Sequence, residues 1–341
     1  MKKVIWAQLI VLLLVLLGAV AVLFMLSRPA VSGQDEADKT QMEQQTQEQE
    51  QEDEAATGEE EQEEEPFVPT WKTYPDTRAL LAQQYFVYDC NTGTFLISSG
   101  TEEERIYPAS VTKLFTAYVA LQYLQPDGQI TAGGELDYVA WGSSVAKLQM
   151  GDVLTVGQLV EAMMLPSGND AAYVLAAAAG RVIADSPEMD AGYAVEVFMN
   201  QMNLQAASLG MTGTHFVNPD GIHDGEHYTS FKDLAVLGKL AMDNPTIMAY
   251  TGVARETVTL HGETVEWKNT NALVDPQSAY YCPYALGLKT GQTPSAGSCL
   301  LSAFRYEEHA LLIGVFGCPE ENDRFDDTLQ LFNSIVLDPV A

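Results

Sequence analysis

The pattern of apolar and polar positions divides the chain into an N-terminal part and a globular part that begins near residue 70. In the globular part, residues 84–100 (QYFVYDCNTGTFLISSG) hold two apolar runs on either side of an Asn-Thr-Gly turn, which predicts two strands. Apolar residues at helical spacing then predict helices over residues 110–124, 155–165, 169–183, 195–211 and 230–242. The pattern ends with predicted strands over residues 285–293, 298–305 and 309–317 and a last helix over residues 324–336.

The order of these elements predicts the fold class. Strands at both ends of the globular part, with helices between them, indicate one sheet in which the first and last strands meet. The helices in the middle would form an inserted helical region. We therefore expect an α+β fold.

The N-terminal part begins with a long apolar run. Residues 4–26 would measure roughly 34 Å as a helix, which is enough to cross a bilayer. Lys2 and Lys3 favour a cytoplasmic location for residues 1–3 and export of the remainder. We expect a single-pass anchor in the cell membrane. The alternative is a signal peptide cleaved after the small residues at 30–32, which would release a secreted protein.

Charge is concentrated in the segment that follows. Residues 31–66 hold 15 acidic residues, one lysine and almost no apolar side chain, so they have nothing to bury in a core. We expect a disordered acidic spacer over residues 27–69 and a single globular domain over residues 70–341. The formal net charge of −30 argues against nucleic acid as a partner.

Cysteines and histidines do not form a recognisable metal site. No CxxC pair and no His/Cys cluster with zinc-ligand spacing occurs, so we expect no metal and assign no histidine to catalysis. The pairing state of the cysteines stays open. The cysteines are Cys90, Cys282, Cys299 and Cys318, and the histidines are His215, His223, His227, His261 and His309.

Three short motifs carry candidate chemistry. In YPASVTKLFTAY, Ser110 and Lys113 lie three residues apart at a predicted helix start, so both side chains would lie on one face. In LPSGNDAA, Ser167 and Asn169 lie between two predicted helices. In GLKTGQT, Lys289 stands in a predicted strand beside a glycine that allows close approach of a ligand backbone. Each motif alone could be only a helix cap, a turn or a strand.

Together, S-x-x-K, S-x-N and K-T-G in this order are the signature of the serine penicillin-recognising enzymes. Over about residues 77–335 the chain resembles the D-alanyl-D-alanine carboxypeptidases of the low-molecular-mass penicillin-binding proteins, peptidase family S11. The segments that carry the resemblance include YPASVTKLFTAYVAL, MMLPSGNDAAYVLA and NTNALVDPQSAYYCPYALGLKTGQTPSAGSCLLSAF. The resemblance implies an α/β/α sandwich of the β-lactamase/transpeptidase-like type, in which helices flank an antiparallel sheet and an all-helical region is inserted.

The resemblance also implies an activity. The enzyme would remove the terminal D-alanine from peptidoglycan stem peptides ending in D-Ala-D-Ala, through an acyl-enzyme and without a cofactor. β-Lactam antibiotics would be covalent inhibitors. The implied catalytic residues are Ser110, Lys113, Ser167 and Asn169, and the implied substrate-binding residues are Lys289, Thr290, Gly291 and Arg324. The oxyanion hole would consist of the backbone N–H groups of Ser110 and Gln292.

Physical chemistry agrees with these roles. A serine hydroxyl is a weak nucleophile that needs a base within hydrogen-bond reach. Burial and the nearby charge of Lys289 would both lower the pKa of Lys113 and so favour its neutral, basic form. Arg324 could instead be a surface arginine. We interpret the segment NPDGIHD at 218–224 as a structural loop.

Two other functions compete with this one. A class A-like β-lactamase would carry a deacylating glutamate on a loop after an S-D-N motif. Here the middle motif is S-G-N, and the following loop (NPDGIHDGEHYTS) lacks a Glu-x-x-Leu-Asn pattern. A catalytically silent penicillin-binding wall protein is the second alternative, and the three intact motifs argue against it.

Overall fold

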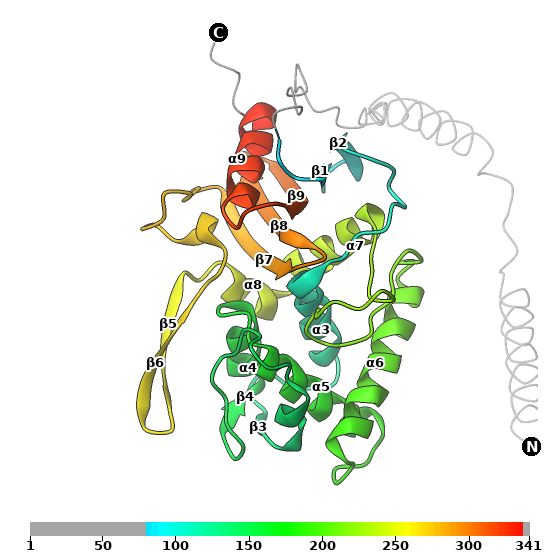
Figure 1. Cartoon of the computed structure of the whole chain (residues 1–341), viewed down its shortest axis with the longest axis vertical. Helices are drawn as coiled ribbons and strands as arrows, with labels where there is room; N and C mark the ends of the chain where they lie inside the picture. Colours follow the sequence, from blue (N-terminus) through cyan, green and yellow to red (C-terminus); the bar gives the residue numbers. More distant parts are fainter. Residues whose placement is uncertain (1–79, 337–341) are drawn as a thin grey trace, which may run out of the picture. The chain divides into compact units, whose positions relative to one another are not determined.

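The computed structural model of the protein describes residues 80–336 (Figure 1). The predicted membrane helix over residues 4–26 and the predicted spacer over residues 27–69 lie outside the described residues, as do both ends of the predicted domain. Between residues 80 and 336, no helix is both long enough and apolar enough to cross a bilayer. The structure therefore bears on the globular part alone.

A five-stranded antiparallel sheet lies at the centre of this part, with the strand order β2-β1-β9-β8-β7. β1 pairs with β9 from Gln84 opposite Phe316 to Asp89 opposite Leu311. The two ends of the domain therefore meet in the sheet, as predicted. The strands are β1 (Gln84–Asp89), β2 (Thr94–Ser98), β7 (Ala285–Thr293), β8 (Gly297–Tyr306) and β9 (His309–Cys318).

Helices cover both faces of the sheet (Figure 1). On one face, Phe332 of α9 (Asp323–Val336) stacks on Phe304 of β8 with ring centroids 4.5 Å apart. On the other face, Phe231 of α7 (Phe231–Met242) packs against Phe86 of β1 at 5.2 Å. This arrangement confirms the predicted α+β sandwich with an antiparallel sheet.

The inserted region is mostly helical and packs beside α7. α5 is buried along most of its length, and its bounds match the prediction. α6 begins at Ala191 rather than at residue 195, because the side chain of Asp190 caps the helix by accepting a bond from the Gly192 N–H. The helices of this region are α3 (Thr112–Ala120), α4 (Val156–Met164), α5 (Asn169–Ile183), α6 (Ala191–Ser208) and α8 (Pro245–Thr251).

Two hairpins and one helix start were not predicted correctly. β3 (Gln129–Thr131) pairs with β4 (Val153–Thr155), and β5 (Arg255–Leu260) pairs with β6 (Glu263–Lys268). The helix predicted from residue 110 begins as a short 3-10 turn, η2 (Ala109–Val111), which leads into α3. Ser110 therefore lies in a tight turn directly before the α-helix.

Candidate active site

Ser110 is held in a strained, closely packed turn. The preceding residue, Ala109, has φ +48°, a left-handed conformation that is uncommon for a residue with a Cβ. Two glycines allow the chain to approach this turn. A Cβ on Gly221 would collide with the Ala109 carbonyl, and one on Gly291 would lie 3.0 Å from the Ser110 nitrogen. The third motif therefore packs directly against the first.

Lys113 is the group that lies beside the Ser110 hydroxyl. Its Nζ is 2.8 Å from Ser110 Oγ and donates to the main-chain carbonyl of Asp220 at 2.7 Å. The side chain is fully buried, and burial lowers the pKa of Lys113 to about 8, although the negative charge of Asp220 opposes the shift. At neutral pH roughly one tenth of Lys113 is therefore neutral, and this form can accept the hydroxyl proton of Ser110.

The Asp220 carbonyl was not predicted as part of the site. It belongs to the loop that we interpreted as structural, and Ser110 Oγ also lies 3.3 Å from it. The Asn218 side chain accepts a bond from the Gly221 N–H, while Thr116 of α3 donates to a carbonyl of the same loop at 2.7 Å. These bonds hold the Asp220 carbonyl beside the Lys113 amine.

The middle motif begins α5. Ser167 is buried and has φ +62°, so it is a second non-glycine residue in the left-handed conformation. The N–H of Asn169 donates to the Ser144 carbonyl at 2.9 Å, which ties the motif to the preceding loop. The Asn169 Oδ1 atom is buried and has no hydrogen-bond partner within residues 80–336. It is therefore an acceptor that a ligand N–H can satisfy.

The third motif places a second lysine in the sheet. Lys289 is fully buried in β7, and its Nζ donates to the Thr290 carbonyl at 3.1 Å. No ion pair joins it to a carboxylate in the described part of the chain. Burial, followed by the positive charges of Lys113 and Arg324, holds the pKa of Lys289 well below its usual value. A bound anion would relieve this repulsion.

Thr270 and Arg324 flank the third motif. Thr270 Oγ1 lies 2.6 Å from Thr290 Oγ1, and Lys289 Nζ lies 3.4 Å from the same Thr270 oxygen. Arg324 is not a surface arginine, because its side chain is buried. It donates to the Gly291 carbonyl at 3.3 Å and to Glu321 at 2.9 Å. The charge of Arg324 therefore lies beside the backbone of the third motif. The contact of Thr270 with this motif was not predicted from the sequence.

Backbone strain marks all three motifs. Within residues 80–336, seven non-glycine residues have a positive φ. Three of these stand at the motifs: Ala109 directly before Ser110, Ser167 itself, and Leu288 (φ +82°) directly before Lys289. Such conformations cost free energy and persist where the surrounding structure enforces them, which is a common property of active sites.

Residues of the first two motifs, together with Gln292 directly after the third, line a cleft of about 540 Å³. Ser110, Asn169 and Gln292 all line it, so the predicted nucleophile and both predicted oxyanion donors face the same space. None of its lining residues carries a charged side chain. The remaining lining residues are Gly142, Ser143, Ser144, Ile222, Thr293, Pro294, Gly297, Ser298 and Pro319.

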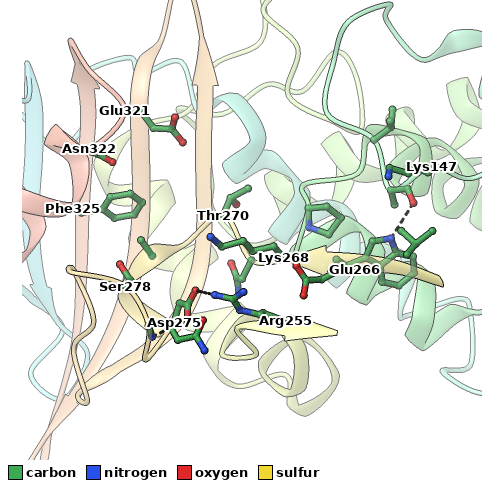
Figure 2. A pocket seen from close by; sticks show the side chains of 18 residues that line it. Lys147, Arg255, Glu266, Lys268, Thr270, Asp275, Ser278, Glu321, Asn322 and Phe325 are labelled. Carbon is green, nitrogen blue, oxygen red and sulfur yellow. Dashed lines mark hydrogen bonds and ion pairs between the residues drawn. The ribbon is translucent and has the colours of Figure 1, made fainter. Parts of the chain in front are cut away.

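A larger cavity of about 700 Å³ lies beside the β5–β6 hairpin (Figure 2). Arg255 and Asp275 form an ion pair across it at 2.7 Å. Glu321, which pairs with Arg324, also lines it. Thr270 is part of its wall and contacts Thr290, so this cavity adjoins the third motif through one residue.

The cysteines show no sign of a redox or metal centre in this structure. All four are free, and three of them are buried. Burial raises the pKa of Cys299 to about 11 and that of Cys318 to about 12, so both are protonated, unreactive thiols at neutral pH. No group of three or more potential metal-ligating residues occurs among residues 80–336.

Comparisons with known proteins agree on one family. A sequence model of the peptidase S11 family, described as D-alanyl-D-alanine carboxypeptidase, matches residues 71–319. The D-alanyl-D-alanine carboxypeptidase of Streptomyces sp. strain K15 is 38% identical over 225 residues, which cover 62% of this chain and 72% of that protein. The D-alanyl-D-alanine carboxypeptidase DacF of Bacillus subtilis is 27% identical over 71% of this chain, and the match spans 59% of DacF.

Solved structures show the same relationship. The crystal structure of the Streptomyces K15 DD-transpeptidase superimposes with a TM-score of 0.66 at 31% identity, covering 77% of this chain and 98% of that one. Penicillin binding protein 6B from Escherichia coli gives a TM-score of 0.65 at 26% identity, covering 79% of this chain and 81% of that one.

Proposed function

The chain belongs to the S11 family of serine peptidases, the D-alanyl-D-alanine carboxypeptidases. We propose that it removes the terminal D-alanine from peptidoglycan stem pentapeptides through an acyl-enzyme on Ser110. One observation carries this proposal. The amine of Lys113 lies 2.8 Å from the Ser110 hydroxyl, and burial lowers the Lys113 pKa to about 8. That pair is an activated nucleophile with its base.

The first chemical step is acylation. Neutral Lys113 takes the proton of Ser110 Oγ, and the oxygen attacks the carbonyl carbon of the penultimate D-alanine. The N–H groups of Ser110 and Gln292 stabilise the oxyanion. When the C–N bond breaks, Ser167 relays a proton to the departing D-alanine nitrogen. Water then attacks the ester, which releases the shortened peptide and regenerates the Ser110 hydroxyl.

Recognition of the free C-terminus rests on the buried cations. Lys289 and Arg324 lie beside Thr290 and Gly291, and Lys289 has no carboxylate partner within the described residues. The terminal carboxylate of the substrate supplies the negative charge that Lys289 lacks as a partner. The unpaired Oδ1 of Asn169 accepts a bond from a substrate amide N–H. β-Lactams carry a carboxylate and a reactive amide, so they acylate Ser110 in the same orientation.

Mass spectrometry of a stem pentapeptide incubated with the protein tests this function. We expect loss of one D-alanine residue and, with penicillin, a stable mass adduct on Ser110. Rapid hydrolysis of the adduct would instead indicate a β-lactamase. Absence of any adduct would indicate a silent binding protein. A product in which an added amine replaces D-alanine would indicate transfer, as the name of the Streptomyces K15 DD-transpeptidase suggests for that protein.

We also propose that the protein acts outside the cytoplasm on an N-terminal membrane anchor. The apolar run over residues 4–26, with Lys2 and Lys3 before it, supports this location. Full-length protein should remain with membranes after carbonate washing. A mature chain that begins at Gly33 would contradict the anchor and favour a cleaved signal peptide.

A further inference from the structure

Trp141 is an unusually exposed aromatic residue beside the cleft. Its side chain is fully solvent-exposed (101%), although burial of so large a ring normally stabilises a protein. It stands in a tight turn in which the Ser143 N–H donates to the Ala140 carbonyl at 3.2 Å, and Ser143 Oγ donates to the same oxygen at 2.6 Å. Gly142, at the third position of the turn, has φ +77°, a conformation that glycine adopts readily. The ring is therefore held outward by a defined turn.

The turn is continuous with the catalytic cleft. Gly142, Ser143 and Ser144 follow Trp141 directly, and all three line the cleft together with Ser110. The Ser144 carbonyl accepts a hydrogen bond from the Asn169 N–H at 2.9 Å. Because two residues span at most roughly 7 Å, Trp141 lies at the rim of the cleft.

A second exposed apolar side chain lines the cleft. Ile222 is 37% exposed, and the ring of the next residue, His223, packs edge-on against Tyr107 at 4.7 Å. The polar side chains that line the cleft carry hydroxyl and amide groups and no charge, in a chain whose formal net charge is −30. An acidic polymer would therefore find no cation among the cleft-lining residues.

This chemistry fits a neutral ligand that is rich in hydroxyl and amide groups and has apolar faces. A pyranose ring with an N-acetyl group meets both conditions, because its axial C–H face can stack on an aromatic ring while its hydroxyl and amide groups form hydrogen bonds. A stem peptide attached to such a sugar extends by roughly 13–14 Å over four residues. A sugar can therefore rest on the rim while its peptide reaches Ser110.

We propose that Trp141 stacks on an N-acetylated sugar of the glycan that carries the stem peptide. The enzyme would then prefer glycan-linked pentapeptide over free pentapeptide. This inference rests on the proposed function and adds a specificity residue to the same site.

Two substrates test the preference in the full-length protein: a free stem pentapeptide and the same peptide attached to its N-acetylhexosamine disaccharide. We expect Trp141→Ala to reduce the ratio of the two kcat/KM values (linked over free) by about 10-fold, which corresponds to about 1.4 kcal/mol. Trp141→Phe keeps an aromatic ring and should retain most of the ratio. Leu204→Ala is the matched control, because Leu204 is 66% exposed on α6, which contributes no residue to the cleft. An unchanged ratio in Trp141→Ala would overturn the proposal.

A binding measurement separates this inference from the carboxypeptidase activity. A peptide-free N-acetylhexosamine tetrasaccharide should shift the tryptophan emission of the wild-type protein to shorter wavelength, and the shift should be absent in Trp141→Phe. An emission spectrum that the tetrasaccharide leaves unchanged would contradict sugar stacking. If neither pentapeptide is cleaved while the shift persists, the proposed function fails and the sugar site stands.

Discussion

The cavity beside the β5–β6 hairpin and the cleft at Ser110 differ in the polar groups that they leave without a partner. The larger one, of about 700 Å³, is lined by several charged side chains, among which Arg255 and Asp275 form an ion pair at 2.7 Å. The smaller cleft, of about 540 Å³, has an uncharged lining that includes Ser110, Asn169 and Gln292. Beneath it lies Lys113, and beside it Asn169 Oδ1 has no partner within the described residues. Size and charge alone would have selected the wrong cavity.

The difference shows where this fold holds groups that only a ligand can satisfy. A buried polar group without a partner costs free energy, as does a left-handed backbone at a residue with a Cβ. Both features occur together beside the smaller cleft, at Ala109, Ser167 and Asn169. The larger cavity has one left-handed residue, Lys147, but none of its lining residues holds a buried polar side-chain atom without a partner. Mutations in the two regions should therefore have very different effects on activity.

Ser110→Ala should have the largest effect. Removing Oγ leaves no atom for acylation, so we expect neither a penicillin adduct nor pentapeptide cleavage. The thermal midpoint should stay close to that of the wild type, because Ser110 is only half-buried and Lys113 keeps its bond to the Asp220 carbonyl. Intact-protein mass spectrometry after incubation with penicillin gives the result directly. A persisting adduct would place the nucleophile elsewhere.

Lys113→Arg should have the second largest effect on activity. Arginine keeps the positive charge but does not deprotonate in proteins, so the variant lacks a neutral base. We expect the acylation rate to fall by about 10²–10⁴-fold, the usual contribution of a general base. Stopped-flow measurement with a chromogenic β-lactam would quantify it. Acylation at a near wild-type rate would mean that another group, for example Lys289, removes the proton.

The assignment of Lys113 as the base also predicts how acylation by the wild-type enzyme depends on pH. Because neutral Lys113 is the reactive form and its pKa is lowered to about 8, acylation should increase as pH rises toward 8 and level off above it. The pH profile of kcat/KM for penicillin acylation measures this directly. A profile that is flat between pH 6 and 9 would contradict Lys113 as the base.

Much of this site could be predicted from the sequence, and the missing parts have physical reasons. Regular elements with strong apolar patterns, such as α5 and β7, have the predicted bounds. The β5–β6 hairpin was missed because few of its side chains are buried, so its apolar alternation is weak. The Asp220 contribution was missed because it is a main-chain carbonyl, which leaves no trace in residue type.

Thr270 illustrates a different limit. Thr270 Oγ1 contacts Thr290 Oγ1, although the two threonines are 20 residues apart in the sequence. Only the folded chain brings them together. By contrast, the pairs within each motif are neighbours in sequence, so their spacing already indicated their function. Residue pairs within one motif could therefore be predicted from the sequence. The contacts between β7 and the preceding loop could not, because they depend on tertiary packing.

Lys289→Ala should have a moderate effect that depends on the substrate. The lysine supplies charge for the terminal carboxylate, so kcat/KM for the free pentapeptide should fall by at least about 10-fold, which corresponds to about 1.4 kcal/mol. The C-terminally amidated peptide lacks that charge and should be affected much less. An equal loss on both peptides would contradict a role in carboxylate recognition.

The smallest effects should come from Thr270 and Arg255, which both line the larger cavity. Thr270→Val keeps the shape of the side chain but removes the hydroxyl bonded to Thr290. A net contribution of about 0.5–1.5 kcal/mol for one hydrogen bond implies a loss of roughly 2- to 10-fold in kcat/KM. Arg255→Gln, in the same cavity, breaks only the partly exposed ion pair with Asp275, so its kcat/KM should stay within about twofold of the wild type. If Arg255→Gln proved as damaging as Thr270→Val, the larger cavity would itself take part in catalysis, and unsatisfied groups would no longer distinguish the two regions.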